Sequence, residues 1–311
     1  MIKRIFAVFG LGFAVIFSQI QTPTGLFSGE SAFKFLEQQV AFGPRNPGSE
    51  GHKNCQHFLI AELKKYTINV STQPFLFTDT DLNRTFTLTN IIAHFPGKAP
   101  QSQRILLAAH WDTRPRADRE KDPELQKQPI LGANDGASGV AVLLEIARIM
   151  VKYPPPVPVD VVLFDGEDYG KVSRHEDYLL GARHFAKNLP RTPYKFGILL
   201  DMVGDKNLRI PKEGYSARML PDLVDKVWKR AQLLKLSVFI NRLGSEILDD
   251  HQPLIQAGVP IIDIIHVDLV GSKYWHTLED TPDKCSPESL KQVGTLLLSL
   301  IYEGLGNSGT Q

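Results

Sequence analysis

From residue 104 onward, short apolar runs alternate with longer segments of helical periodicity, and this alternation is the strongest constraint on the fold. The runs are apolar on nearly every residue, as is typical of strands that are buried on both faces of a sheet. Strands and helices in alternation predict a mostly parallel sheet that helices cover on both sides. The expected strands are residues 104–110, 159–165, 195–204 and 259–267, and the expected helices are residues 136–153, 178–189, 219–234 and 286–305.

The preceding region predicts two helices and an antiparallel edge. Within residues 31–66, apolar residues recur at helical spacing on both sides of a Pro/Gly-rich turn, and Ser49 is the expected N-cap of the second helix. Strand-like runs follow at residues 68–77 and 85–95. No linker interrupts the chain after its first residues. We therefore expect one α/β domain over residues 25–311, with a mixed, mostly parallel central sheet flanked by helices on both faces.

Residues 1–24 are expected to be a leader or an anchor. Lys3 and Arg4 precede the apolar residues 5–17. This run of about 13 residues is too short to cross a bilayer core of about 30 Å and suits the centre of a signal peptide. No A-x-A motif follows, so an uncleaved membrane anchor is the alternative. We expect export, to the periplasm or out of the cell.

Charge and cysteine content exclude two classes of function. A net charge of +1 without a basic stripe argues against a nucleic-acid partner. The cysteines, Cys55 and Cys285, lie outside any C-x-x-C pattern, so they form no thiolate metal site. In an oxidising compartment they could pair, and two unpaired buried thiols are the alternative.

The stretch VVLFDGEDYG, residues 161–170, ends an apolar run in three acids. Asp165, Glu167 and Asp168 would repel one another and resist desolvation at the end of a buried strand. A cation, a reaction or solvent must hold them there. If the chain stays extended, Glu167 and Asp168 point to opposite sides. One could then bind a metal while the other faces a substrate and carries protons.

Side chains that bind metals also follow the other expected strands. They are His110 and Asp112, Asp135 in the loop before a helix, Asp201, the Asp249-Asp250-His251 run, and His276 in a late loop. Ligands bind outside the carboxyl ends of the strands in such sheets. Histidine with carboxylates is a donor set that suits zinc. Taken singly, Asp135 could instead be a helix N-cap, Asp201 a turn residue, and each histidine a core residue.

Together these motifs resemble the M28-type zinc aminopeptidases and, within them, the bacterial glutaminyl cyclases. The resemblance lies in FGPRNPGSEGH, HWDTRPRAD, PILGANDGASGVAVLLEIAR, DGEDYG, GILLDMVGDK, DDHQPLIQAGVPIIDII and YWHTLEDT, and it covers about residues 30–303. It implies a zinc-exopeptidase fold and the conversion of N-terminal glutaminyl residues of peptides to pyroglutamate, with release of ammonia.

The resemblance also implies roles for single residues. One zinc ion per chain would be held by Asp135, Asp168 and His276. Glu167 would be the proton shuttle, with Asp201 and Asp249 as an acidic relay beside the substrate. The substrate pocket would contain Trp275 and Ile247, and a monomer is expected.

An aminopeptidase that removes the N-terminal residue is the alternative. Such peptidases bind a second metal with the equivalents of His110 and Asp201. The cyclases keep both residues while binding one ion, so their presence does not decide between the two activities. A silent peptide-binding scaffold is the third reading, although every ligand position is intact. The acidic pair here is Glu-Asp, and aspartate is one methylene shorter than glutamate.

Overall fold

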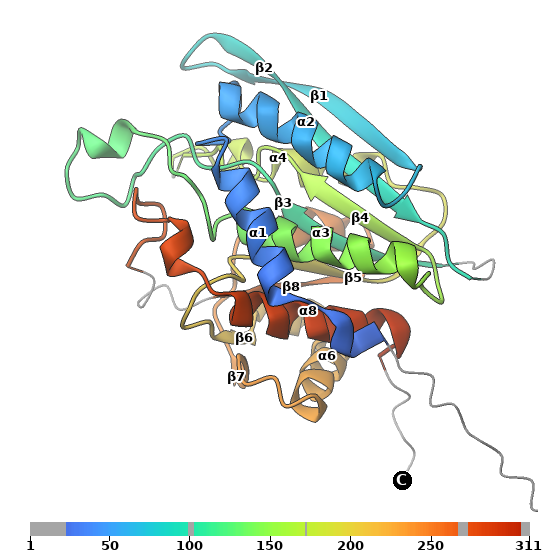
Figure 1. Cartoon of the computed structure of the whole chain (residues 1–311). Coiled ribbons are helices and arrows are strands. Elements are labelled where there is room, and N and C mark those ends of the chain that lie inside the picture. The colour runs from blue at the N-terminus through green and yellow to red at the C-terminus, as the bar shows by residue number, and fades with distance from the viewer. Residues whose placement is uncertain (1–22, 99–102, 172, 267–272, 306–311) are drawn as a thin grey trace, which may run out of the picture.

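Six strands form the central sheet of the computed structural model, which describes residues 23–98, 103–171, 173–266 and 273–305 (Figure 1). Their order is β1-β2-β4-β3-β5-β8. The strands are β1 (Val70–Asp79), β2 (Arg84–Phe95), β3 (Arg104–His110), β4 (Val159–Phe164), β5 (Tyr194–Asp201) and β8 (Ile261–Ile265). Strands β4, β3, β5 and β8 run parallel, whereas β1 and β2 form an antiparallel edge. The expected mixed sheet is confirmed.

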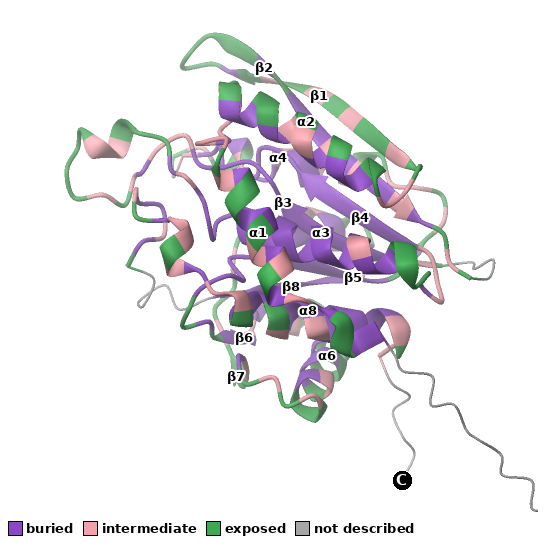
Figure 2. Cartoon of the chain, in the orientation of Figure 1, coloured by how far each residue is buried: buried purple, intermediate pink, exposed green. Residues whose placement is uncertain are grey.

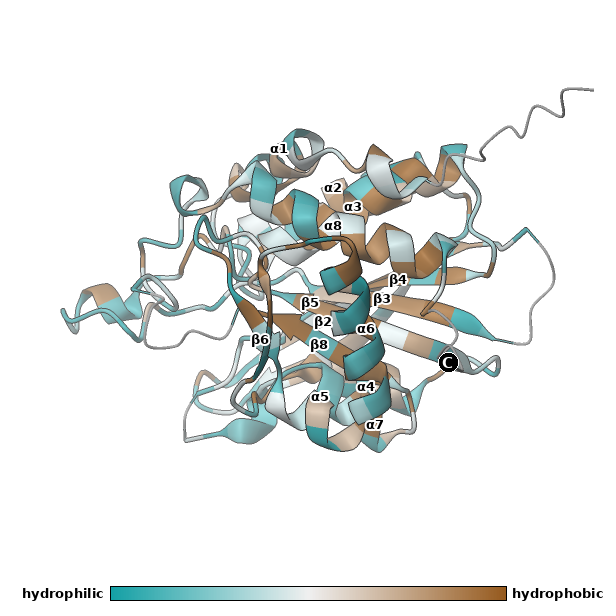
Figure 3. Cartoon of the chain, turned by 90° about the horizontal axis from the view of Figure 1, so that it is seen from below, coloured by the Kyte–Doolittle hydropathy of each residue, from teal (hydrophilic) through white to brown (hydrophobic). Residues whose placement is uncertain are grey.

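Helices cover the sheet on two sides, as seen from below in Figure 3. One layer contains α1 (Gly29–Val40), α2 (Glu50–Lys64), α3 (Ala137–Lys152) and α8 (Pro287–Tyr302). The opposite layer contains α4 (Leu180–Lys187), α5 (Gly214–Met219) and α7 (His251–Gln256). The α6 helix (Pro221–Leu233) packs against α8 and against β7 (Phe239–Leu243). Ser49 is the N-cap of α2, as expected, and its side chain accepts a hydrogen bond from the His52 amide.

Alternate strand residues pack into two separate apolar cores, because successive side chains point to opposite faces. In β3, Leu107 joins the core under α1, α3 and α8, whereas Leu106 joins the core under α4 and α7. The central strands and α3 are buried almost throughout (Figure 2). This explains why the strands are apolar on nearly every residue.

The sequence pattern does not predict several short elements. They are α5, α7 and a two-stranded sheet of β6 (Ile210–Lys212) with β7. Cys55 and Cys285 are both buried and free, so the unpaired alternative is confirmed. The leader expected at residues 1–24 falls almost entirely outside the described residues. Among the residues that the structure describes, none of the helices combines the length and apolarity needed to span a bilayer.

Candidate active site

The carboxyl ends of β3, β4 and β5 meet at one edge of the sheet and carry the polar residues singled out above. His110 at the end of β3 pairs in register with Phe164 at the end of β4, and Asp201 ends β5. Because parallel strands end at the same edge, residues that are far apart in sequence converge there. A cavity of about 560 Å³ opens at this edge.

The acidic stretch after β4 does not continue as a strand. β4 ends at Phe164, and Gly166 has a φ of +73°, a left-handed conformation that suits glycine. The chain therefore does not stay extended through Glu167 and Asp168, so the condition for their side chains to alternate is not met. Both side chains nevertheless line the cavity.

Asp165 is buried among structural partners and does not line the cavity. One carboxylate oxygen lies 2.8 Å from Nε2 of His52, and the other accepts a hydrogen bond from the Thr89 amide at 2.6 Å. His52 in turn stacks on Trp111. These contacts attach the end of β4 to α2 and β2, so this acid has a structural role.

We expect Asp165→Ala to lower the free energy of unfolding by about 3–5 kcal/mol, because it leaves His52 and the Thr89 amide buried without their partner. Denaturant unfolding measures this loss. Asp81→Ala is the control, since Asp81 is exposed and its ion pairs with Lys171 and Arg174 are open to solvent, so its change should stay within about 1 kcal/mol. Equal unfolding free energies for the two variants would contradict the structural role of Asp165.

Asp112 holds the turn that carries the other two acids. Its two carboxylate oxygens accept hydrogen bonds from the backbone amides of Glu167 and Asp168, at 3.1 and 3.3 Å. The side chain is fully buried. Asp112 is therefore a support for the acidic turn, and it does not line the cavity.

Asp135, Asp168 and His276 converge on a position that fits a metal ion. One donor atom from each residue lies within 4.8 Å of the other two. Nε2 of His276 is 3.5 Å from Oδ2 of Asp135 and 3.5 Å from Oδ2 of Asp168. The Asp168 Oδ2 atom is buried and makes no hydrogen bond within the described part of the chain. A histidine and two carboxylates, with one oxygen left over, suit zinc.

The alternative role of Asp135 as a helix N-cap is wrong. Helix α3 begins after Gly136, which is its N-cap residue, and no side chain caps it. Instead, the Asp135 and Asn134 amides donate to the carboxylate of Asp280, at 3.1 and 2.8 Å. The Asp135 side chain is thus free to face the cavity, where it lies 3.1 Å from Nε2 of His110.

His110 lies behind this trio and contacts a second group of acids. Its Nε2 atom is 3.2 Å from Oδ1 of Asp201. One donor atom each of His110, Asp135 and Asp201 also lies within 4.8 Å of the other two. Two possible cation positions therefore share Asp135.

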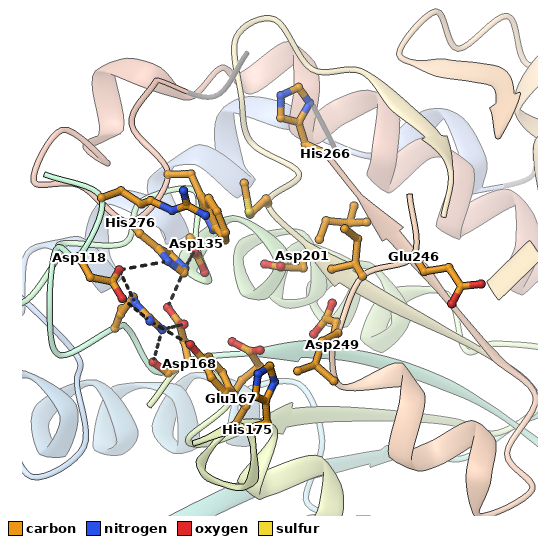
Figure 4. Close-up of a pocket in the computed structure, with 18 residues that line it drawn as sticks. Asp118, Asp135, Glu167, Asp168, His175, Asp201, Glu246, Asp249, His266 and His276 are labelled. Atoms are coloured by element: carbon orange, nitrogen blue, oxygen red, sulfur yellow. Dashed lines mark hydrogen bonds and ion pairs between the residues drawn. The ribbon is translucent and has the colours of Figure 1, made fainter. Parts of the chain in front are cut away.

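The remaining walls of the cavity combine acids with apolar side chains. Figure 4 shows Glu167, Asp201 and Asp249 directed at the same space beside the Asp135, Asp168 and His276 group. Trp275 and Ile247 also line the cavity. The Trp275 ring centroid is 4.0 Å from that of His276, and the Arg119 guanidinium lies 4.8 Å from the indole centroid. The result is an acidic cavity with an aromatic side.

Crowded acids perturb proton binding in this cavity. Burial, followed by the negative charge of Asp168, raises the pKa of Glu167 well above its usual value. Burial also raises the pKa of Asp201 to about 7, although a hydrogen bond with His110 opposes the shift. A bound cation would offset much of this repulsion and lower the pKa values of these acids, because it favours the ionised carboxylates.

The residues that support the ligands were not predicted from the sequence. Asp280 positions the loop of Asp135, and Arg114 and Asp118 contact Asp168 and His276. All three lie inside quoted motifs, HWDTRPRAD and YWHTLEDT. Their position within those motifs was the one sign in the sequence that they matter. Which residues they contact is known only from the fold.

Comparison with known proteins gives consistent matches over most of the chain. Residues 90–301 match peptidase family M28. A bovine glutaminyl-peptide cyclotransferase-like protein is 26% identical over 292 residues, which cover 84% of this chain and 72% of that protein.

Two solved structures are similar over almost their whole length. Glutaminyl cyclase of Bacteroides thetaiotaomicron, bound to N-acetylhistamine, is 38% identical, with a TM-score of 0.83 and coverage of 89% of this chain and 98% of that one. Glutaminyl cyclase of Tannerella forsythia is 40% identical, with a TM-score of 0.82 and the same coverage of both chains.

Proposed function

The chain belongs to peptidase family M28 and, within it, to the bacterial glutaminyl cyclases, and we propose from this membership how its own residues perform the reaction. The protein is a glutaminyl-peptide cyclotransferase, which converts N-terminal glutaminyl residues of peptides to pyroglutamate and ammonia. The observation that carries this function is the 38–40% identity to glutaminyl cyclases over nearly their whole length.

Asp135, Asp168 and His276 would hold one zinc ion per chain. Two observations support this assignment: Asp168 Oδ2 makes no hydrogen bond to any described residue, and three donor atoms converge. When bound, zinc supplies Lewis acidity to the side-chain carboxamide of the glutaminyl residue. All other steps fall to the side chains of the protein and to the substrate itself.

Glu167 would carry the proton in the reaction. The α-amine of the substrate forms a bond to its own side-chain carboxamide carbon, and the bond from that carbon to the amide nitrogen breaks. Glu167 accepts the proton that the amine loses and delivers it to the departing nitrogen, which leaves as ammonia. Because the nucleophile and the carbonyl belong to one residue, the enzyme gains mainly by holding that residue in a cyclic conformation.

Asp201 and Asp249 would bind the substrate amine. Both line the cavity beside Glu167 (Figure 4), and both are largely buried. Two close, buried carboxyl groups titrate jointly, so one proton shared between them serves as a relay while the amine changes its charge.

Trp275 would form the flat wall against which the glutaminyl side chain lies. We expect Trp275→Ala to reduce kcat/KM for a Gln-initiated peptide by about tenfold or more, equivalent to about 1.4 kcal/mol, because the aromatic contact and its burial are lost. Steady-state kinetics measure this change. Trp275→Phe retains a ring and should recover part of the activity. A loss below about twofold in the alanine variant would show that Trp275 does not form the wall against which the substrate lies.

Mass spectrometry of a short peptide beginning Gln-Gly tests the function directly. Cyclisation removes one ammonia and leaves the number of residues unchanged. An aminopeptidase instead releases the whole N-terminal residue. That second activity is favoured by the His110, Asp135 and Asp201 group, which shares Asp135 with the first ligand set and could hold a second cation beside the first. A shortened peptide and two metal ions per chain would establish it.

The location and the partners remain part of the proposal. The leader pattern of residues 1–24 supports an exported, periplasmic or secreted enzyme. Its substrates would be peptides or proteins with N-terminal glutamine, and it would act as a monomer.

A further inference from the structure

Arg114 lies behind the proposed ligands, in the segment that follows β3. Its guanidinium is buried, with a side-chain exposure of 1%. A buried arginine needs compensation for its lost hydration, which comes from charged hydrogen bonds. All of the nitrogen atoms of this guanidinium donate hydrogen bonds. Four of the five acceptor atoms belong to Asp168 and Asp118, and the fifth is the Tyr178 hydroxyl oxygen.

The first acceptor is the ligand Asp168. Nη1 of Arg114 donates to Asp168 Oδ1 at 2.5 Å and to the Asp168 carbonyl oxygen at 3.2 Å. The other carboxylate oxygen, Oδ2, is buried, makes no hydrogen bond to any described residue, and lies 3.5 Å from Nε2 of His276. Arg114 thus occupies one oxygen of Asp168 and leaves the other for a cation.

The second acceptor is Asp118, which lies behind His276. Nε and Nη2 of Arg114 donate to the two Asp118 oxygens at 2.9 and 2.6 Å, a bidentate arrangement. Asp118 Oδ1 lies 3.5 Å from Nδ1 of His276. A carboxylate that two hydrogen bonds from Arg114 hold beside Nδ1 favours the tautomer with its proton there, which leaves Nε2 free to bind a metal.

We propose that Arg114 is a positioning residue for the metal, which holds Asp168 as a one-oxygen ligand and, through Asp118, turns Nε2 of His276 toward the same ion. This inference rests on the zinc site of the proposed function and is independent of which reaction the site performs. One guanidinium would then orient two of the three ligands. Lysine cannot replace it, because an ammonium group lacks the planar fork that reaches two carboxylates at once.

Zinc affinity of the full-length protein, measured by competition with a chromophoric chelator, provides the first test. We expect Arg114→Lys to weaken zinc binding by about 10–100-fold, the usual effect of losing a group that orients a ligand. Arg116→Lys is the matched control. Arg116 Nη1 donates to the carbonyl oxygens of Tyr169 and Gly170, at 2.9 and 2.6 Å, and contacts none of the ligands. Its zinc affinity should equal that of the unmodified chain.

Visible absorption of the cobalt-substituted protein provides a reading that reports on coordination alone. If the three side chains and one water held cobalt, the ion would be four-coordinate, and four-coordinate cobalt absorbs more intensely than cobalt with more ligands. If Arg114→Lys frees the second oxygen of Asp168 to bind the ion as well, we expect the absorption to fall severalfold. Asp118→Asn should weaken zinc binding through His276 yet keep the intense spectrum, because Arg114 still occupies Asp168 Oδ1.

Each outcome decides the inference. Unchanged zinc affinity and an unchanged cobalt spectrum in Arg114→Lys would overturn it. Equal weakening in Arg116→Lys would also overturn it, since the effect would then come from the loop. If Arg114→Lys fails to fold, Asp118→Asn decides, and zinc binding as tight as in the unmodified chain overturns the link to His276. A chain that binds no zinc before mutation refutes the proposed metal itself, whereas a peptidase product leaves this inference standing.

Discussion

Glu167→Gln is expected to lose nearly all turnover while it keeps the fold and the metal. Glutamine has the same shape as glutamate, so the cavity and its neighbours stay in place. It cannot accept the proton that the substrate amine must lose during ring closure. A positioned acid-base group contributes about 10²–10⁴-fold to a rate, and we expect a loss of kcat in this range. Kinetics with a Gln-initiated peptide measure it, together with the zinc content and the thermal unfolding of each variant.

Glu246→Gln is a matched control for this variant. Glu246 also lines the cavity, but it is exposed and forms an ion pair with Arg218 at 2.7 Å. The same chemical change at that position should leave kcat close to that of the unmodified enzyme. An active Glu167→Gln protein would refute the shuttle assignment. Loss of zinc from that protein would instead show that Glu167 is a ligand.

The central sheet was predictable because its signal is local. Buried parallel strands must be apolar on nearly every residue, and the helices that cover them must be amphipathic, so both patterns are visible in short windows. The helices α5 and α7 were missed, since each has only six residues. At that length neither completes two helical turns, and α7 contains Pro253. Tertiary contacts, rather than periodicity, stabilise such elements.

The site was predictable in its residue types but not in its supporting contacts. Strand ends indicated where Asp135, Asp201 and His276 would gather, because the sheet topology itself determines that edge. Asp118 and Asp280 could not be assigned in this way. Asp118 contacts a histidine more than 150 residues away, and Asp280 binds the backbone amide of Asp135. The turn at Gly166 also changes the directions of the Glu167 and Asp168 side chains. The opposite orientations that an extended strand would give therefore do not apply.

Removal of the metal is expected to abolish activity and to lower the melting temperature. Asp135, Glu167, Asp168 and Asp201 surround one cavity, and a cation offsets their mutual repulsion in the folded state alone. An ion at about 100 times its dissociation constant stabilises the native state by about 2.7 kcal/mol. Dialysis against a chelator should therefore lower both activity and melting temperature, and zinc should restore them. His276→Ala should reproduce the loss without recovery, because one of three ligands is absent.

The number of bound ions shows whether one or both of the two ligand sets that share Asp135 bind a metal. Metal analysis of the purified chain should give one zinc, and His110→Asn should leave that number unchanged, because His110 is not among the three proposed ligands. If the purified chain instead holds two ions and His110→Asn holds one, the second set of His110, Asp135 and Asp201 is a true site. The chemistry would then follow the two-metal scheme of the peptidases, in which Glu167 activates water instead of accepting a proton from the substrate amine. A melting temperature that is indifferent to chelation would contradict the premise that a cation balances the acids of this cavity.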